Sequence, residues 1–140
     1  MSKSTDELLN ILKHSQNIEE YLESAEDSLI ETTLQKELLT MFAAQDRKPA
    51  ALFRLAGIDK SYGYEILSGT KRPSRDKLLA LLFALQASAD DTQALLKATG
   101  YPPLYAKHTR DSVILFALQN GTALSDLNET LYDMGLELVK

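Results

Sequence analysis

Charged and polar side chains gather between residues 47 and 77, where their types and spacing are suited to binding an anion. Eight basic residues face three acidic ones there, a net charge of +5, although the whole chain of 140 residues carries −5. Lysine, serine, tyrosine and glutamate follow Asp59 within six residues and supply both hydrogen-bond donors and acceptors. Because lysine and arginine bind phosphate oxygens, this stretch indicates a polyanionic partner.

The remainder of the chain is acidic. Residues 1–46 carry a net charge of −7, and residues 78–140 carry −3. An asymmetry of this kind describes the electrostatics of a partner rather than the fold. We therefore expect the central stretch to make the charged contacts.

Other chemistries lack the residues that they need. The absence of cysteine excludes disulfides, thiolate metal sites and thiol nucleophiles, and His14 and His108 have no companions at ligand spacing. No nucleophile–base arrangement, Walker loop or dinucleotide fingerprint is present. We expect no metal, no cofactor and no enzymatic activity.

The apolar runs are too short for a membrane protein. The longest covers residues 78–85, against about 18 residues needed to cross a bilayer. Charged residues also interrupt the apolar group at residues 8–12, so no signal-peptide core is visible. We expect a cytoplasmic protein that does not bind membranes.

The elements that must position the polar cluster are all helical. Apolar residues recur at three- and four-residue spacing along the whole chain, and no alternating run predicts a strand, so the fold class is all-α. The predicted helices cover roughly 8–12, 18–22, 33–46, 50–56, 59–67, 75–86, 90–99, 109–120 and 125–134.

Residues 49–68 predict a short helix, a turn and a second short helix. Pro49 suits a first helical turn, Gly57 permits a tight turn, and Asp59 is a plausible N-cap for a helix through Leu67. Leu52, Ala56, Ile58 and Ile66 would form the core beneath them. The second helix would then face outward, where it could enter a major groove about 12 Å wide.

These residues follow a known pattern, which reads Ala56-Gly57-Ile58-Asp59-Lys60-Ser61, then Ile66, Gly69, Lys71-Arg72-Pro73-Ser74, Leu78, Leu81 and Leu85. The pattern resembles the Cro/repressor-type (lambda-repressor-like, or xenobiotic-response-element) family of helix-turn-helix regulators, over about residues 34–100. The resemblance implies a DNA-binding domain at residues 32–100, a recognition helix at about Asp59–Leu67, double-stranded DNA as the partner and a homodimer.

The resemblance also implies individual contacts. Base-reading residues would be Lys60, Ser61, Tyr64 and Glu65. Phosphate-contacting residues would be Lys48, Lys71, Arg72, Arg75 and Lys77. For Glu65, an ion pair with Lys60 or Arg72 is the alternative.

Three positions depart from the family pattern. Phe53 stands where a small residue is usual, and Gly63 stands where a branched aliphatic residue is usual. We interpret these two as a volume exchange, in which the ring of Phe53 fills the space beside Gly63. The third is Pro49, where a contacting glutamine is often found.

Extensions flank this domain. Residues 1–31, with a net charge of −6, predict two amphipathic helices that pack on the domain or on a second subunit; alternatively, this acidic segment competes with DNA for the basic face. Residues 101–140 predict a helical hairpin, a candidate dimer or partner surface that could equally be core. Protein partners could bind through either extension.

A weak internal repeat links the two halves of the C-terminal region. Arg75-Asp76 recurs as Arg110-Asp111, at an offset of 35 residues, whereas Phe83–Gln86 and Phe116–Gln119 match at an offset of 33. This predicts a duplicated helical hairpin whose second copy has a shorter first helix and a longer turn.

A rival function belongs to another class. The overall charge of −5 favours a protein-interaction module, such as an adaptor, antitoxin or antirepressor, built on the same helix-turn-helix.

Overall fold

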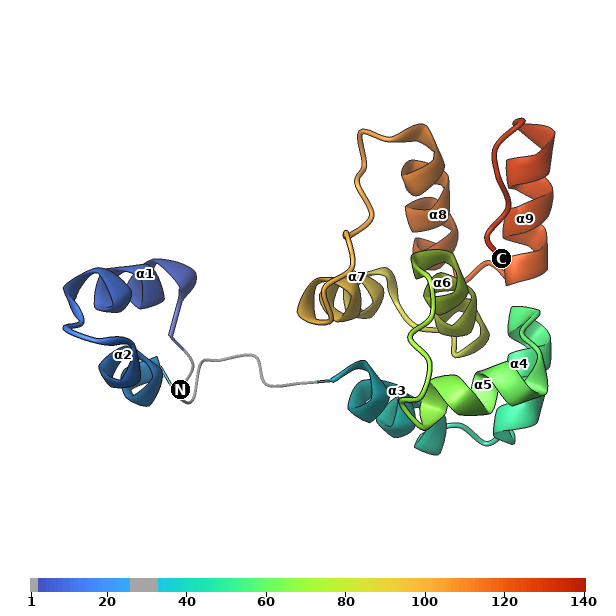
Figure 1. Ribbon diagram of the computed structural model, residues 1–140. Coiled ribbons are helices and arrows are strands. Elements are labelled where there is room, and N and C mark those ends of the chain that lie inside the picture. The colour runs from blue at the N-terminus through green and yellow to red at the C-terminus, as the bar shows by residue number, and fades with distance from the viewer. Residues whose placement is uncertain (1–2, 26–32) are drawn as a thin grey trace. The chain divides into compact units, whose positions relative to one another are not determined.

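The computed structural model describes residues 3–25 and 33–140, and within these ranges every regular element is a helix (Figure 1). The all-α class predicted from periodicity is confirmed. The chain divides into two compact units, Met1–Glu31 and Thr32–Lys140. The predicted boundary after residue 31 separates these units, but residues 101–140 belong to the same unit as the helices before them.

The first unit contains a pair of short helices, α1 (Thr5–His14) and α2 (Ile18–Ala25). Asn17 Oδ1 accepts from the Glu20 amide at 2.7 Å, and the Glu20 carboxylate accepts from the Gln16 amide at 3.0 Å. This reciprocal capping explains where α2 begins. Among the described residues of this unit, four large apolar side chains are exposed: Leu9, Leu12, Ile18 and Leu22.

The second unit is a bundle around one central helix. Its helices are α3 (Leu34–Ala43), α4 (Pro49–Ala56), α5 (Lys60–Leu67), α6 (Arg75–Ala84), α7 (Ala89–Ala98), α8 (Thr109–Gln119) and α9 (Leu124–Asp133). Every residue from Leu78 to Leu85 is buried, so α6 is apolar on all sides. α6 packs against α4 on one side and against α9 on another.

Side-chain caps fix where several of these helices begin. Thr33 accepts from the Lys36 amide, Ser74 from the Lys77 amide and Ser88 from the Asp91 amide. Each cap satisfies one amide that the helix itself leaves unpaired. From the sequence, either Thr32 or Thr33 could begin this helix, and Thr33 is the N-cap of α3.

The predicted duplication is present, with a single register. Helix α9 begins and ends 35 residues after α7, and α8 contains the segment 35 residues after α6. Gln93 exchanges two hydrogen bonds with the backbone of Leu104, and Asn128 does the same with Val139, again 35 residues later. The repeated unit is therefore a helical hairpin followed by an extended segment.

The predicted change of offset to 33 was wrong. α8 is 11 residues long and α6 is 10, so the second copy has no shortened first helix. The turns also correspond at 35 residues, because Gln86 and Gly121 both have left-handed backbone, with φ of 57° and 65°. The match of Phe83–Gln86 to Phe116–Gln119 is thus a chance similarity two residues out of register.

The two hairpins hold each other reciprocally. Arg75 pairs with Asp111 at 3.1 Å, and Arg110 pairs with Asp76 at 2.8 Å. Equivalent residues therefore exchange equivalent contacts, as across the two-fold interface of a dimer. Such an arrangement is a closed pair of hairpins, not the start of an open solenoid.

Candidate nucleic-acid interface

The α4–α5 pair is shaped by the turn between its helices. Gly57 ends α4 with φ of 69°, which favours glycine, and Ile58 is buried beneath the turn. The carboxylate of Asp59 accepts from the amides of Ser61 and Tyr62 and so begins α5. The predicted roles of Gly57 and Asp59 are confirmed.

A close contact between Phe53 and Gly63 sets the distance between these two helices. The Phe53 ring is 1% exposed, and a Cβ atom placed on Gly63 would lie 2.6 Å from three of its carbon atoms. Any side chain at position 63 would therefore collide with the ring. The predicted volume exchange is confirmed, and it explains why a glycine is tolerated inside α5.

The first turn of α5 is open to solvent. Lys60 and Ser61 are both exposed, and neither side chain has a hydrogen-bond or ion-pair partner in the part of the chain that the structure describes. Tyr64 is 44% exposed and sets its ring against Phe53, at 5.2 Å between centroids and 85° between planes. Tyr64 thus packs in part against the core and is in part exposed to solvent.

Glu65 lies half-buried further along α5. Its backbone carbonyl accepts from the amides of Thr70 and Lys71, which closes the end of the helix. Its carboxylate forms an ion pair with neither Lys60 nor Arg72, so the alternative structural role considered for it is not found.

Three lysines from outside α5 differ in their surroundings. Lys48, the N-cap of α4, and Lys71, just after α5, are exposed and have no side-chain partner among the described residues. Lys77 of α6 is half-buried, and its ammonium lies 5.6 Å from the centre of the Tyr62 ring. This cation–π contact places a positive charge of α6 beside α5.

Arg72 is held by the chain itself. Its guanidinium donates to the carbonyl of Thr99 and lies over the Tyr101 ring, 4.3 Å from the centroid. The Tyr101 hydroxyl in turn donates to the carbonyl of Pro73 at 2.6 Å. Burial raises the pKa of Tyr101, and the nearby charge of Arg72 opposes that rise.

Sequence interpretation overlooked this role of Tyr101, since it treated the residue as part of a connector. The only signal was its place before two prolines, which says nothing about a contact nearly thirty residues back. Arg72 is still exposed and could reach a phosphate, but its orientation is set by Thr99 and Tyr101.

Arg75 has little capacity left for a partner. Its guanidinium donates to the carbonyls of Pro102 and Pro103, both at 2.9 Å, and to both carboxylate oxygens of Asp111. These four bonds engage four of the five N–H groups that an arginine carries. Arg75 therefore fastens the extended segment after α7, and we omit it from the candidate phosphate contacts.

The partner of Arg75 is itself electrostatically unusual. Burial alone would raise the pKa of Asp111, but hydrogen bonds from Arg75 and from the Tyr105 amide, with the charges of Arg75 and His108, lower it below its usual value. Asp111 consequently stays ionised. This arrangement is structural and adds nothing to the surface of α5.

Two further properties bear on the class of protein. No helix in the described ranges is long and apolar enough to cross a membrane, and no group of three acidic or histidine side chains there could hold a metal ion. Comparisons of the chain with protein-family models, with curated proteins and with solved structures found no match. The function proposed below is accordingly argued from the residues and contacts of this chain.

Proposed function

We propose that the protein is a sequence-specific DNA-binding regulator of the lambda-repressor-like type, with α5 as its recognition helix. The observation that carries the proposal is the open first turn of α5, where Lys60 and Ser61 are exposed and unpartnered, beside the Phe53–Gly63 contact that holds α5 on α4. A helix of this kind fits a major groove, and its N-terminal residues reach base edges.

Each side chain of α5 has a distinct role in the proposal. Lys60 donates to O6 or N7 of guanine, Ser61 bonds to either kind of base edge, and Glu65 accepts from N4 of cytosine. Tyr64 contacts a base or sugar with its outer edge. Because the Phe53 ring backs Tyr64, its position is fixed before DNA binds.

Backbone contacts come from the flanking cations. Lys48 and Lys71 are free to bind phosphates, whereas Lys77 and Arg72 would bind them from positions set by Tyr62 and Tyr101. Such contacts position the protein without reading sequence. A dimer would place two recognition helices about 34–36 Å apart on a palindromic site.

Selection of bound duplexes from a random pool, followed by affinity measurement across a range of salt concentrations, tests the proposal. We expect one enriched sequence and a strong loss of affinity with salt, because neutralised phosphates release counterions. Lys60→Ala should relax preference at one base position, with a loss of about 1–3 kcal/mol. No enriched sequence, or affinity independent of salt, would contradict DNA binding.

A second candidate function is favoured by exposed apolar residues in the second hairpin. Phe116, Tyr132 and Met134 are 67%, 75% and 51% exposed. In the first hairpin the residue equivalent to Phe116 is Leu81, which is fully buried. Phe116 is thus exposed where its equivalent Leu81 is buried by the rest of the fold. This difference favours a surface that binds a protein partner, either another protein or a second copy of this chain.

Analytical ultracentrifugation distinguishes self-association through the surface around Phe116 from binding of a different protein there. If a second copy covers Phe116, then Phe116→Ser should shift a dimer to a monomer and weaken binding to a palindromic site more than to a single half-site. A Ser substitution that leaves mass and binding unchanged would exclude self-association through α8. Leu39→Ser, another exposed apolar position but on α3, is the matched control.

A further inference from the structure

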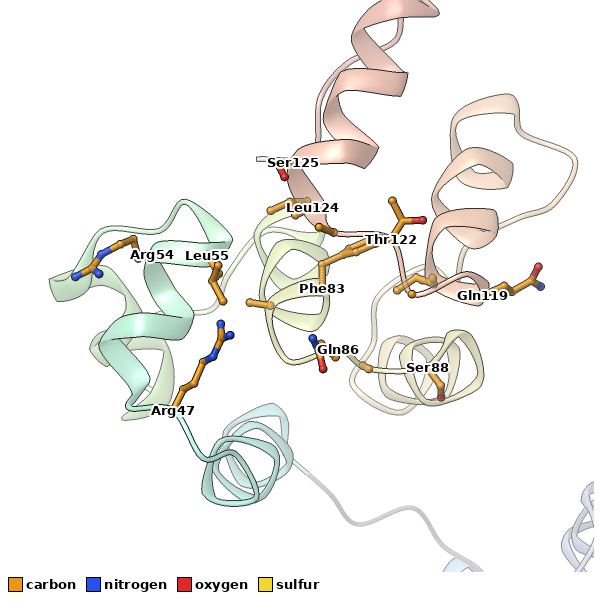
Figure 2. A pocket seen from close by; sticks show the side chains of 15 residues that line it. Arg47, Arg54, Leu55, Phe83, Gln86, Ser88, Gln119, Thr122, Leu124 and Ser125 are labelled. Carbon is orange, nitrogen blue, oxygen red and sulfur yellow. The ribbon is translucent and has the colours of Figure 1, made fainter.

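A cavity of about 690 Å³ lies away from α5, between α4 and the C-terminal ends of α6 and α8 (Figure 2). Its volume falls within the range of about 300–1,000 Å³ that is usual for small-molecule sites. None of its lining residues comes from α3 or α5. The cavity is thus separate from the surface proposed for DNA.

The cavity is built on the internal repeat. Residues 86–88, in the turn between α6 and α7, and residues 121–123, in the equivalent turn between α8 and α9, both line it. Apolar side chains cover much of its wall: Leu55, Phe83, Leu118 and Leu124. An apolar body of one or two rings would therefore be in contact with both hairpins and with α4.

One cation is directed into this space. Figure 2 shows the Arg47 side chain extending between α4 and α6, with its guanidinium toward Leu55, whereas the Arg54 side chain turns away. Arg47 has no ion-pair or hydrogen-bond partner among the described residues. Its planar group with parallel N–H donors matches a carboxylate.

A strained residue also lines the cavity. Gln86 is the only described residue other than glycine with positive φ, at 57°, and its equivalent in the second hairpin is Gly121. Left-handed backbone disfavours side chains, so glycine is the ordinary choice for this turn. Strain of this kind is concentrated at functional sites, and here it places an amide side chain on the cavity wall.

From these observations we propose that the cavity binds a small amphipathic monocarboxylate with an aromatic body. Arg47 pairs with the carboxylate, the Gln86 amide donates to it, and the ring system packs on Phe83, Leu118 and Leu124. The ligand thereby joins the start of α4 to the α8–α9 hairpin. The proposal does not depend on DNA binding, since it concerns different residues.

The test uses the full chain with 2-naphthylacetate and its uncharged isostere 2-naphthylacetamide as probes. Isothermal titration calorimetry measures the affinity and the stoichiometry for each probe. We expect one saturable site per chain with about tenfold higher affinity for the carboxylate, because a hydrogen-bonded charge adds to the packing of the ring. Equal affinities, or no saturable binding of either probe at millimolar concentration, would overturn the proposal.

Variants locate the site. Arg47→Gln should lower the affinity for 2-naphthylacetate about tenfold and leave the affinity for 2-naphthylacetamide unchanged. Lys107→Gln, which removes an exposed cation outside the cavity, should change neither affinity. Ser125→Phe, at an exposed position on the cavity wall, should weaken both probes. Unfolding curves verify that each variant is folded. If a folded Arg47→Gln protein still preferred the carboxylate, the assignment would be wrong.

Discussion

Arg75 donates hydrogen bonds to both carboxylate oxygens of Asp111, a residue 36 positions further along the chain. The reciprocal pair joins Arg110 to Asp76 and is more open, because the Asp76 side chain is 28% exposed and that of Asp111 is 9%. Each arginine also binds the extended segment that ends its own hairpin. The same two residue types therefore close both copies, with different degrees of burial.

This difference in burial predicts unequal effects of two matched substitutions. Asp111→Asn should lower the free energy of unfolding by about 3 kcal/mol, because it leaves the Arg75 charge without its buried partner. Asp76→Asn should cost about 1 kcal/mol or less, since its pair is more exposed to water. Urea unfolding at neutral pH measures both. Equal losses would contradict a special role for the more buried pair.

The depressed pKa of Asp111 also predicts a dependence on pH. An aspartate in the unfolded chain titrates near pH 4, and in the folded chain Asp111 titrates lower. Its stabilising contribution is therefore complete above about pH 4 and is lost as the pH falls through the folded value. Between about pH 5 and 3 the wild type should lose more stability than Asp111→Asn, measured by urea unfolding at each pH. Parallel curves would refute this linkage.

The Phe53–Gly63 contact predicts strong coupling between two positions. Phe53→Ala should destabilise by about 3–5 kcal/mol through the cavity it leaves, and Gly63→Val by about 1–3 kcal/mol through collision with the ring. Together they should cost clearly less than the sum, because the valine fills the space of the missing ring. Thermal unfolding of the four proteins measures this. Leu39→Ala, at an exposed apolar position on α3, should change stability by less than about 0.5 kcal/mol.

Local chemistry made much of the α4–α5 region predictable from sequence. The N-cap at Asp59, the glycine at position 57 and the exchange between Phe53 and Gly63 each depend on residues a few positions apart or on one pair of volumes. A helix start or a tight turn needs specific side chains at fixed offsets. Sequence alone therefore located the candidate surface.

Long-range partners were not predictable in the same way. Arg75 and Lys71 are both basic residues near Pro73. The Arg75 side chain donates hydrogen bonds to Pro102, Pro103 and Asp111, whereas the Lys71 side chain has no partner among the described residues. Charge alone cannot distinguish them, because the difference lies in the return of a segment about thirty residues later. The predicted register of the repeat was wrong for a related reason. Similar residues recur by chance in helical sequences, whereas equivalent hydrogen-bond partners, which the sequence does not show, identify the true offset.

The strained turn at Gln86 predicts a gain in stability on substitution. Gln86→Gly should stabilise by about 0.5–1 kcal/mol, the difference between roughly 1–2 kcal/mol of left-handed strain and the entropy cost of glycine. Gly121→Ala, at the equivalent turn, should destabilise by about 1 kcal/mol, although its Cβ would meet no atom within 4 Å. Thermal unfolding measures both, and a less stable Gln86→Gly protein would mean that the glutamine side chain supports the fold.

Substitutions of Lys71 and Arg75 should affect DNA binding differently, although the two residues are only four positions apart. Lys71→Ala should leave unfolding unchanged, weaken binding to all duplexes alike and reduce the salt slope by about one, because one phosphate contact is lost. Arg75→Ala should lower stability, while the salt slope measured on the folded fraction stays as in the wild type. Lys107→Ala, outside residues 47–77, is the control with one fewer positive charge. Equal reductions of the slope for Lys107→Ala and Lys71→Ala would show that net charge, and not the surface around α5, governs the interaction with DNA.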